Sequence, residues 1–229
     1  MPQNKKKRDI LVFVTRQGGE CAECGRDLNK GDIIFLERET GPLCLACADL
    51  GHLLYLRAGN ARLTRLAKKY SKLYAVVLKW ARARKRYERQ GILVEAQALE
   101  KSERECFDEE EFQQRLQRRE AEERLYLNED FIRTFLQKLN QLFPKCPSGT
   151  AHTIAREACY WYCDQLGQPI FVLDDEIVFN VVQTYVRHQY TNYDELLMSG
   201  LNRLGARNAV REQADAVLRK WGWSGASTR

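Results

Sequence analysis

The chain of 229 residues lacks any run of about 20 apolar residues, the length that an α-helix needs to cross a bilayer. Its first nine residues, MPQNKKKRD, are basic, but the apolar run ILVFV behind them is too short for the core of a secretory signal. Low-complexity tracts and repeats of solenoid period are also absent. We therefore expect a soluble, cytoplasmic protein with no membrane partner, in which residues 1–9 form a disordered basic tail.

Marks of catalysis are scarce as well. The sequence has no glycine-rich phosphate loop and no cysteine–histidine pair arranged as a nucleophile and its base. It also has no recognisable motif that reads bases. These absences favour a protein without enzymatic activity over an enzyme.

The charge of the chain is concentrated in one block. The formal net charge of +6 hides a segment, residues 60–91, that holds 11 basic residues and 1 acidic residue. The next segment, residues 92–127, holds 6 basic and 11 acidic residues, whereas the rest of the chain is close to neutral. Such asymmetry points to a partner of opposite charge.

Residues 10–59 are expected to form a small β-containing module around a metal ion. Strands are predicted at ILVFVTR and DIIFLERE, followed by a short helix over residues 45–58. Two C-x-x-C pairs, separated by 19 residues, supply the ligands Cys21, Cys24, Cys44 and Cys47. This spacing is typical of a four-thiolate zinc site, and four protein ligands leave no open position, so a structural zinc ion is predicted.

Two questions about this module stay open at the level of sequence. An iron–sulfur cluster is the alternative occupant, whereas a redox dithiol is disfavoured because no βαβ pattern surrounds the cysteines. A treble-clef-like finger, in which the second pair opens the short helix, and a zinc ribbon both fit the spacing. His52 is interpreted as a residue of that helix rather than as a ligand.

A helical arm is predicted over residues 60–127. Apolar residues recur every three or four positions through residues 60–91, which predicts one long basic helix, and residues 92–127 predict a charged helix with few apolar positions. Residues 128–229 predict a compact helical domain whose first helix is capped by Asn128. The expected fold class is therefore mainly α, with the β-containing zinc module at one end of a long charged arm.

The basic half of the arm is the predicted nucleic-acid-binding element. Most of its basic side chains would form a ridge beside the apolar stripe and could follow several phosphates of RNA or a ribonucleoprotein, which we slightly prefer to DNA. Interleaved aromatic residues could stack on unpaired bases, but their positions on the stripe make most of them core. The residues of the ridge are Arg62, Arg65, Lys68, Lys69, Lys72, Lys79, Arg82, Arg84, Lys85, Arg86 and Arg89.

The acidic segment that follows supplies the alternative. Folded back as a helical hairpin, its glutamates would neutralise part of the ridge and leave the arm to bind a protein. A protein–protein adaptor or scaffold is therefore the second hypothesis. The heptad-like stripe also permits a homodimer through the arm.

A dense polar segment, RHQYTNYDELLMSGLNRLGAR, occupies residues 187–207. Its pattern R-H-x-x-T-x-Y-D-x-L-L-x-x-G-x-x-R-x-x-A-R resembles the hallmark of an uncharacterised bacterial family, the domain of unknown function numbered twenty-two ninety-three. Residues 63–95 also look like the block that often precedes this domain, so the resemblance spans about residues 60–221, behind the four-cysteine module. The family brings no established activity to this chain.

The polar residues of this segment have no assigned role: Arg187, His188, Thr191, Tyr193, Asp194, Arg203 and Arg207. A third hypothesis, a phosphodiester hydrolase, makes His188 a general base or acid that Asp194 orients. The structural interpretation, which we favour, makes Asp194 a helix N-cap and gives His188 a buried partner. No residue is therefore predicted to be catalytic.

Overall fold

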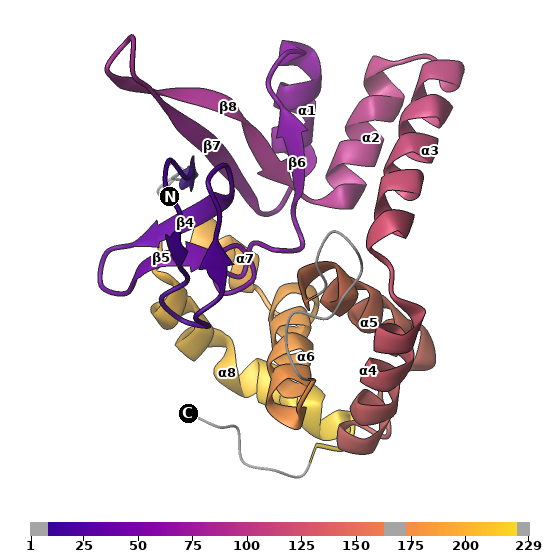
Figure 1. Ribbon diagram of the computed structural model, residues 1–229. Helices are drawn as coiled ribbons and strands as arrows, with labels where there is room; N and C mark the ends of the chain where they lie inside the picture. Colours follow the sequence, from indigo (N-terminus) through magenta and orange to yellow (C-terminus); the bar gives the residue numbers. More distant parts are fainter. Residues whose placement is uncertain (1–8, 163–172, 224–229) are drawn as a thin grey trace, which may run out of the picture. The chain divides into compact units, whose positions relative to one another are not determined.

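A computed structural model of the chain (Figure 1) describes residues 9–162 and 173–223. The basic tail expected at residues 1–9 lies outside these ranges except for Asp9. The chain divides into two compact units, Met1–Gln114 with Leu197–Gly200, and Arg115–Leu196 with Leu201–Arg229. Within the described ranges, every helix is too short or too polar to cross a membrane.

A six-stranded mixed sheet forms the framework of the first unit. Its strand order is β5-β4-β1-β7-β8-β6, with β1 and β7 parallel and all other neighbours antiparallel. The strands are β1 (Ile10–Val14), β4 (Ile33–Glu37), β5 (Gly41–Cys44), β6 (Leu54–Arg57), β7 (Tyr74–Ala81) and β8 (Arg86–Val94). A separate small hairpin consists of β2 (Gly19–Glu20) and β3 (Asp27–Leu28). Strands of the predicted metal-binding module (residues 10–59) and of the predicted arm (residues 60–127) thus belong to one sheet.

The long helix predicted over residues 60–91 is wrong. Only α1 (Ala61–Tyr70) is helical there, and residues 74–94 form the antiparallel pair of β7 and β8. The stretch YAVVLKW is rich in β-branched and aromatic residues, and its first four residues are buried, as in a central strand covered on both faces. The apolar residues spaced by three and four positions therefore belong partly to helix α1 and partly to strand β7, and not to one helix. The coiled-coil homodimer that the sequence permitted required a long helix in this segment, and the structure has two strands there instead.

The short helix predicted over residues 45–58 is also wrong, because turns lead from Cys44 directly to β6. By contrast, the strands predicted at ILVFVTR and DIIFLERE are confirmed by β1 and β4. The acidic segment is helical as predicted, but as two helices, α2 (Ala96–Cys106) and α3 (Glu109–Tyr126). Helix α2 packs against α1, and α3 leads from the first unit into the second.

The second unit is helical, as predicted for residues 128–229. It contains α4 (Glu129–Leu142), α5 (Ser148–Tyr162), α6 (Asp175–Tyr190), the first four residues of α7 (Tyr193–Met198) and α8 (Arg203–Lys220). The side chain of Asn128 accepts a hydrogen bond from the Phe131 N–H, which confirms the predicted N-cap of α4. Phe135, Ile154 and Val182 are fully buried and represent the core between α4, α5 and α6.

Candidate metal centre and nucleic-acid interface

The four paired cysteines meet at one point of the first unit. The sulfur atoms of Cys21, Cys24, Cys44 and Cys47 all lie within 4.8 Å of one another, and those of Cys24 and Cys44 are 3.9 Å apart. A tetrahedral zinc ion with Zn–S bonds of about 2.3 Å holds its sulfur ligands about 3.8 Å apart. The arrangement therefore fits a four-coordinate metal ion, and His52 does not belong to this group.

Two loops bring these sulfurs together. In the first loop the Cys21 N–H donates to the Arg26 carbonyl (2.8 Å) and the Gly25 N–H donates to the Cys21 carbonyl (2.9 Å), with Gly25 at a φ of 70°. This positive φ favours glycine. The Ala22 N–H then donates to the Pro42 carbonyl (2.9 Å), which joins the first loop to β5 and so to the second pair.

Backbone N–H groups also point to the sulfur atoms of Cys44 and Cys21. The Cys47 N–H points to the Cys44 sulfur at 3.4 Å, and the Cys44 N–H points to the Cys21 sulfur at 3.3 Å. Hydrogen bonds from the Cys47 thiol and the Cys47 N–H lower the pKa of Cys44 to about 5. The thiolate form, which binds metal, is therefore favoured at Cys44, whereas the hydrogen bond to Cys44 and burial raise the pKa of Cys47.

The outer half of the β7–β8 hairpin is exposed and basic. We call residues 78–89 the basic ribbon; it contains a four-residue turn, Arg82–Lys85, and extends away from the rest of its unit (Figure 1). Residues 74–77 and 91–94 at the base of the hairpin are buried, whereas residues 82–87 are exposed. The basic residues of the ribbon are Lys79, Arg82, Arg84, Lys85, Arg86 and Arg89, and its single acidic residue is Glu88.

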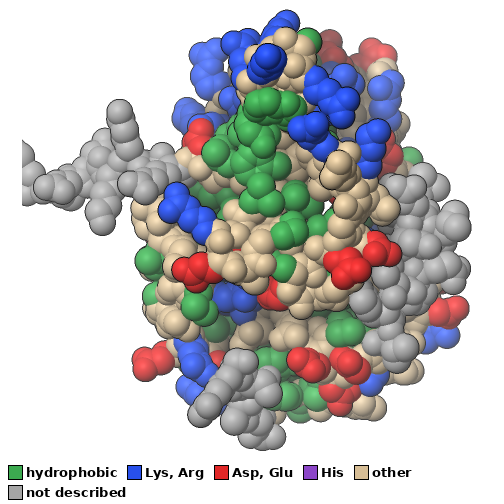
Figure 2. Space-filling model, turned by 60° about the vertical axis from the view of Figure 1, so that its left-hand side comes forward, with side chains coloured by type: hydrophobic (Ala, Val, Ile, Leu, Met, Phe, Trp, Pro, Cys, Tyr) green, Lys and Arg blue, Asp and Glu red, His purple; other side chains and the backbone are tan. Residues whose placement is uncertain are grey.

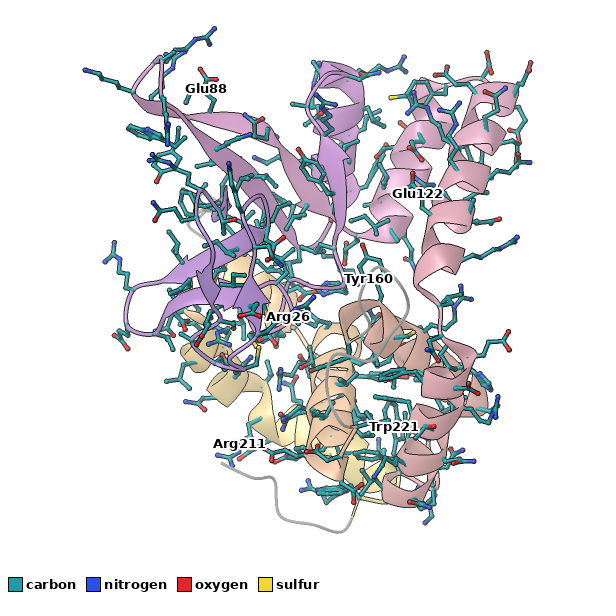
Figure 3. The ribbon with its side chains drawn as sticks, viewed as in Figure 1. Arg26, Glu88, Glu122, Tyr160, Arg211 and Trp221 are labelled. Carbon is teal, nitrogen blue, oxygen red and sulfur yellow. The ribbon has the colours of Figure 1, made fainter. Side chains whose placement is uncertain are left out.

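Glu88 offsets only part of this charge. It pairs with Arg84 at 2.8 Å and with Arg86 at 3.7 Å, and the two arginine side chains remain 66% and 65% exposed; Figure 3 labels Glu88 near the outer end of the hairpin. Exposed pairs of this kind contribute little stability. Across the described residues, no ion pair engages Lys79, Arg82 or Lys85.

A second group of cations lines a hollow between α1 and β8, which we call the basic hollow. Its volume is about 370 Å³, and its lining includes Arg65, Lys68 and Arg89. Lys68 donates to Asp9 at 2.9 Å, and Tyr74 donates to the same carboxylate at 2.7 Å. Burial raises the pKa of Asp9, but these hydrogen bonds outweigh it and keep the pKa below its usual value. Asp9 therefore offsets one of the three cations.

Aromatic side chains lie between these two basic groups. The ring of Tyr87 makes edge-to-face contacts with Phe13 and Trp80, at centroid distances of 5.2 and 5.1 Å. The pairings Phe13–Leu78 and Trp80–Tyr87 place all three rings on one face of the sheet, since directly opposed residues share a face. Tyr87 is 52% exposed, and Leu11 and Leu36 on the same face are 42% and 47% exposed. We call these five residues the aromatic face.

Figure 2 turns the hairpin side of the molecule forward. Hydrophobic side chains gather in the upper part of the surface, with Lys and Arg side chains beside and above them. Sequence reasoning missed Phe13, Leu11 and Leu36 because a strand of alternating burial does not reveal which face stays open. It named Trp80 and Tyr87 as interleaved aromatics but assigned most such residues to the core.

The remaining predicted nucleic-acid contacts are dispersed. Arg62 and Lys69 lie on α1, and Lys72 lies in the turn after it. One Arg62 N–H donates to the Glu105 carbonyl (3.1 Å). Glu105 also accepts a hydrogen bond from Tyr70 (2.6 Å). The acidic segment therefore contacts α1, but among the described residues none of its carboxylates forms an ion pair with a cation of the predicted ridge, and the ion pairs of the ribbon involve only Glu88.

The polar motif of residues 187–207 forms a buried joint between α6 and α7. His188 Nδ1 and Asp194 Oδ1 lie 2.6 Å apart, and both side chains are nearly inaccessible to solvent. The Thr191 hydroxyl donates to the Arg187 carbonyl (2.5 Å) and accepts from the Tyr193 N–H (3.2 Å). The expected N-cap role of Asp194 is therefore wrong, because its carboxylate binds His188 instead. The contact between Asp194 and His188, which the catalytic hypothesis also required, is present.

Arg187, also part of the motif, makes further contacts within α6 and with the start of α7. Arg187 donates to Gln183 (2.8 Å) and to Thr184 (2.7 Å), and its guanidinium lies 5.9 Å from the centre of the Tyr193 ring. Arg203 and Arg207 are half-buried in the first turns of α8. These contacts favour a structural role for Arg187 in holding α6 against the following turn.

Glu157 on α5 is a titratable residue that sequence reasoning missed. Burial raises its pKa to about 7, and the nearby charge of His188 acts in the opposite direction. No sequence pattern links a glutamate on α5 to a histidine 31 positions later, so only the packing of α5 and α6 reveals the pair.

Comparisons with known proteins identify one segment of the chain. Residues 138–222 match the model of a family described as "Uncharacterized conserved protein (DUF2293)". The match includes the whole of the 187–207 motif, which confirms the resemblance for this part of the chain. No curated protein and no solved structure matches this chain.

Proposed function

We propose that this chain, which carries a DUF2293 segment at residues 138–222, is a zinc-stabilised protein without enzymatic activity that binds nucleic acid, RNA in preference to DNA. The observation that carries the proposal is the basic ribbon, which holds six basic residues and one acidic residue on an exposed hairpin. A long, exposed β-ribbon with this charge suits phosphate contacts, and these supply most of the non-specific affinity for nucleic acids.

Zinc is the proposed occupant of the four-cysteine group. Four thiolates at tetrahedral spacing suit zinc, and they leave no position for water or substrate, so the ion would be structural. The first cysteine pair lies in the loop between β2 and β3, and the second pair lies at the end of β5, which pairs with β4 and through β4 with β1. The metal would therefore stabilise the edge of the sheet that supports the ribbon.

The hydrolase hypothesis receives less support. The imidazole of His188 is bonded to Asp194 and is only 4% exposed, which suits a structural pair better than a base that meets a large substrate. The adaptor hypothesis predicts that a protein binds the first unit instead, and the test below separates the two.

The test compares two variants with the same change in charge. The ribbon variant carries Arg82→Glu, Arg84→Glu, Lys85→Glu and Arg86→Glu; the control carries Arg118→Glu, Arg124→Glu, Lys145→Glu and Arg211→Glu, four exposed cations of the second unit. Fluorescence anisotropy would measure the affinity of metal-loaded protein for labelled RNA and DNA from 50 to 300 mM salt. Wild type should show a slope of several units in log affinity against log salt.

We expect the ribbon variant to lose at least tenfold more affinity than the control and to show a shallower salt slope by about 3 to 3.5 units, because each of the four lost phosphate contacts removes about 0.7 to 0.9. Equal losses in the two folded variants, or no binding by wild type at 50 mM salt, would contradict the proposal. A stoichiometric protein partner that survives nuclease treatment would then favour the adaptor.

A further inference from the structure

We infer that the aromatic face and the basic hollow form one binding surface for an unpaired nucleic-acid strand, with a base stacked on Tyr87 and a phosphate held by Arg65 and Arg89. This inference rests on the proposed function and specifies its ligand. It assigns a role to Phe13, Trp80 and Tyr87, which the electrostatic proposal does not use.

The two groups are contiguous on one side of the sheet. Tyr87 and Arg89 are separated by one residue on β8, and their partners Trp80 and Leu78 are likewise separated by one residue on β7. Both therefore point to the same face, about 7 Å apart along the strand. Lys68 of α1 lies 4.6 Å from the centre of the Tyr74 ring, and Tyr74 shares the Trp80 side of β7, which places the hollow on this face too.

Tyr87 is suited to stacking because its ring is both exposed and held in place. Phe13 and Trp80 contact the ring edge-to-face on two sides, so little side-chain freedom remains to be lost when a base binds. Aromatic side chains on open sheet faces bind unpaired bases in this way, and a base within a duplex cannot present its face to them.

Charge identifies the occupant as nucleic acid rather than an apolar peptide. The aromatic face is bordered by the turn residues Arg82–Lys85 on one side and by the hollow with Arg65 and Arg89 on the other. A ligand that crosses this surface must combine flat apolar groups with regularly spaced negative charges. Single-stranded RNA or DNA has this combination along its whole length.

The experiment measures the binding of a 12-nucleotide single-stranded RNA and of its duplex to wild type and three variants at one salt concentration. Tyr87→Ala removes the ring, Tyr87→Phe keeps it, and Tyr160→Ala removes a tyrosine of similar exposure (50%) from α5 in the second unit. We expect Tyr87→Ala to weaken single-strand binding about 5- to 150-fold, the range for one stacked base, and to change duplex binding less than twofold. Tyr87→Phe and Tyr160→Ala should remain within threefold of wild type for both ligands.

A second variant tests the hollow. Arg65→Gln with Arg89→Gln should lower the salt slope for the single strand by about 1 to 1.5 units, while Tyr87→Ala should leave that slope unchanged. Single-strand affinity that Tyr87→Ala leaves intact, or equal losses for single strand and duplex, would overturn this inference while the proposed function stands. No binding of either RNA by wild type would overturn both, and loss of a co-purified protein in Tyr87→Ala with RNA affinity unchanged would assign the face to a protein.

Discussion

At position 91, a glycine is required by the backbone of the neighbouring strand. Gly91 lies in β8 opposite Arg57 of β6 and Val77 of β7, next to the register shift between Val77 and Leu78. A Cβ atom at this position would lie 2.2 Å from the Leu56 carbonyl oxygen. The sequence predicted a long helix that ends at residue 91, whereas in the structure glycine is needed here because two backbones approach closely at a bulge.

The variant Gly91→Ala should therefore lower the free energy of unfolding by about 1 to 3 kcal/mol, because β6 must move away from β8 to accept the methyl group. Urea denaturation followed by circular dichroism would measure the change. Gly149→Ala is the matched control, since nothing lies within 4 Å of its added Cβ on α5, and it should be neutral or slightly stabilising. Equal stability of the two variants would show that the strands do not approach this closely.

Glu157 is the residue whose environment predicts a pH dependence. Burial raises its pKa from 4.5 to about 7, so between these values the folded chain holds a proton here that the unfolded chain releases. The contribution of this residue to stability is therefore greatest at low pH and is lost as the pH rises through 7. Its proximity to His188 places this effect within the second unit.

We expect wild type to lose about 2 kcal/mol more than Glu157→Gln between pH 5 and pH 8, because the glutamine stays neutral throughout. Urea denaturation at several pH values would give both profiles. Glu212→Gln, which changes an exposed carboxylate on α8, should keep the wild-type profile. Parallel profiles for wild type and Glu157→Gln would show that the carboxyl group is solvated.

At the scale of elements, the cysteine loops and the edge of the sheet form one structural unit. Strands β2 and β3, on either side of the first cysteine loop, have only two residues each. Short strands of this kind are marginal without a further constraint. A metal ion bound by both loops would provide this constraint.

Replacement of Cys44 by serine should therefore remove the bound metal and open the loops. Native mass spectrometry should find one zinc ion per wild-type chain and none in Cys44→Ser, and hydrogen exchange should show faster exchange at residues 19–47 than in wild type. Cys106→Ser changes a cysteine outside the cluster and should keep the metal. A wild-type protein purified without metal, or a Cys44→Ser variant that keeps it, would refute the assignment. Iron in place of zinc would support the cluster alternative.

At the scale of the whole molecule, charge is segregated by unit. All 11 basic residues of positions 60–91 belong to the first unit, whereas residues 128–229 have no net charge. The sign and place of this excess are a property of the sequence and hold for any fold. The arrangement of the basic residues differs from the prediction: they lie on a hairpin and around a hollow on one face of a sheet, and not along one helical ridge.

Local sequence was enough to predict the features that depend on near neighbours: the grouping of the four cysteines, whose C-x-x-C spacing is set by one tight turn, the N-cap at Asn128, and the basic block. The features that depend on distant partners came only from the folded structure. Residues 74–81 form a strand because β1, more than sixty positions earlier, pairs alongside them, and no local periodicity contains that information. The same reason applies to the aromatic face and to Glu157 beside His188, since sheet pairing and helix packing join residues that only the folded chain brings together.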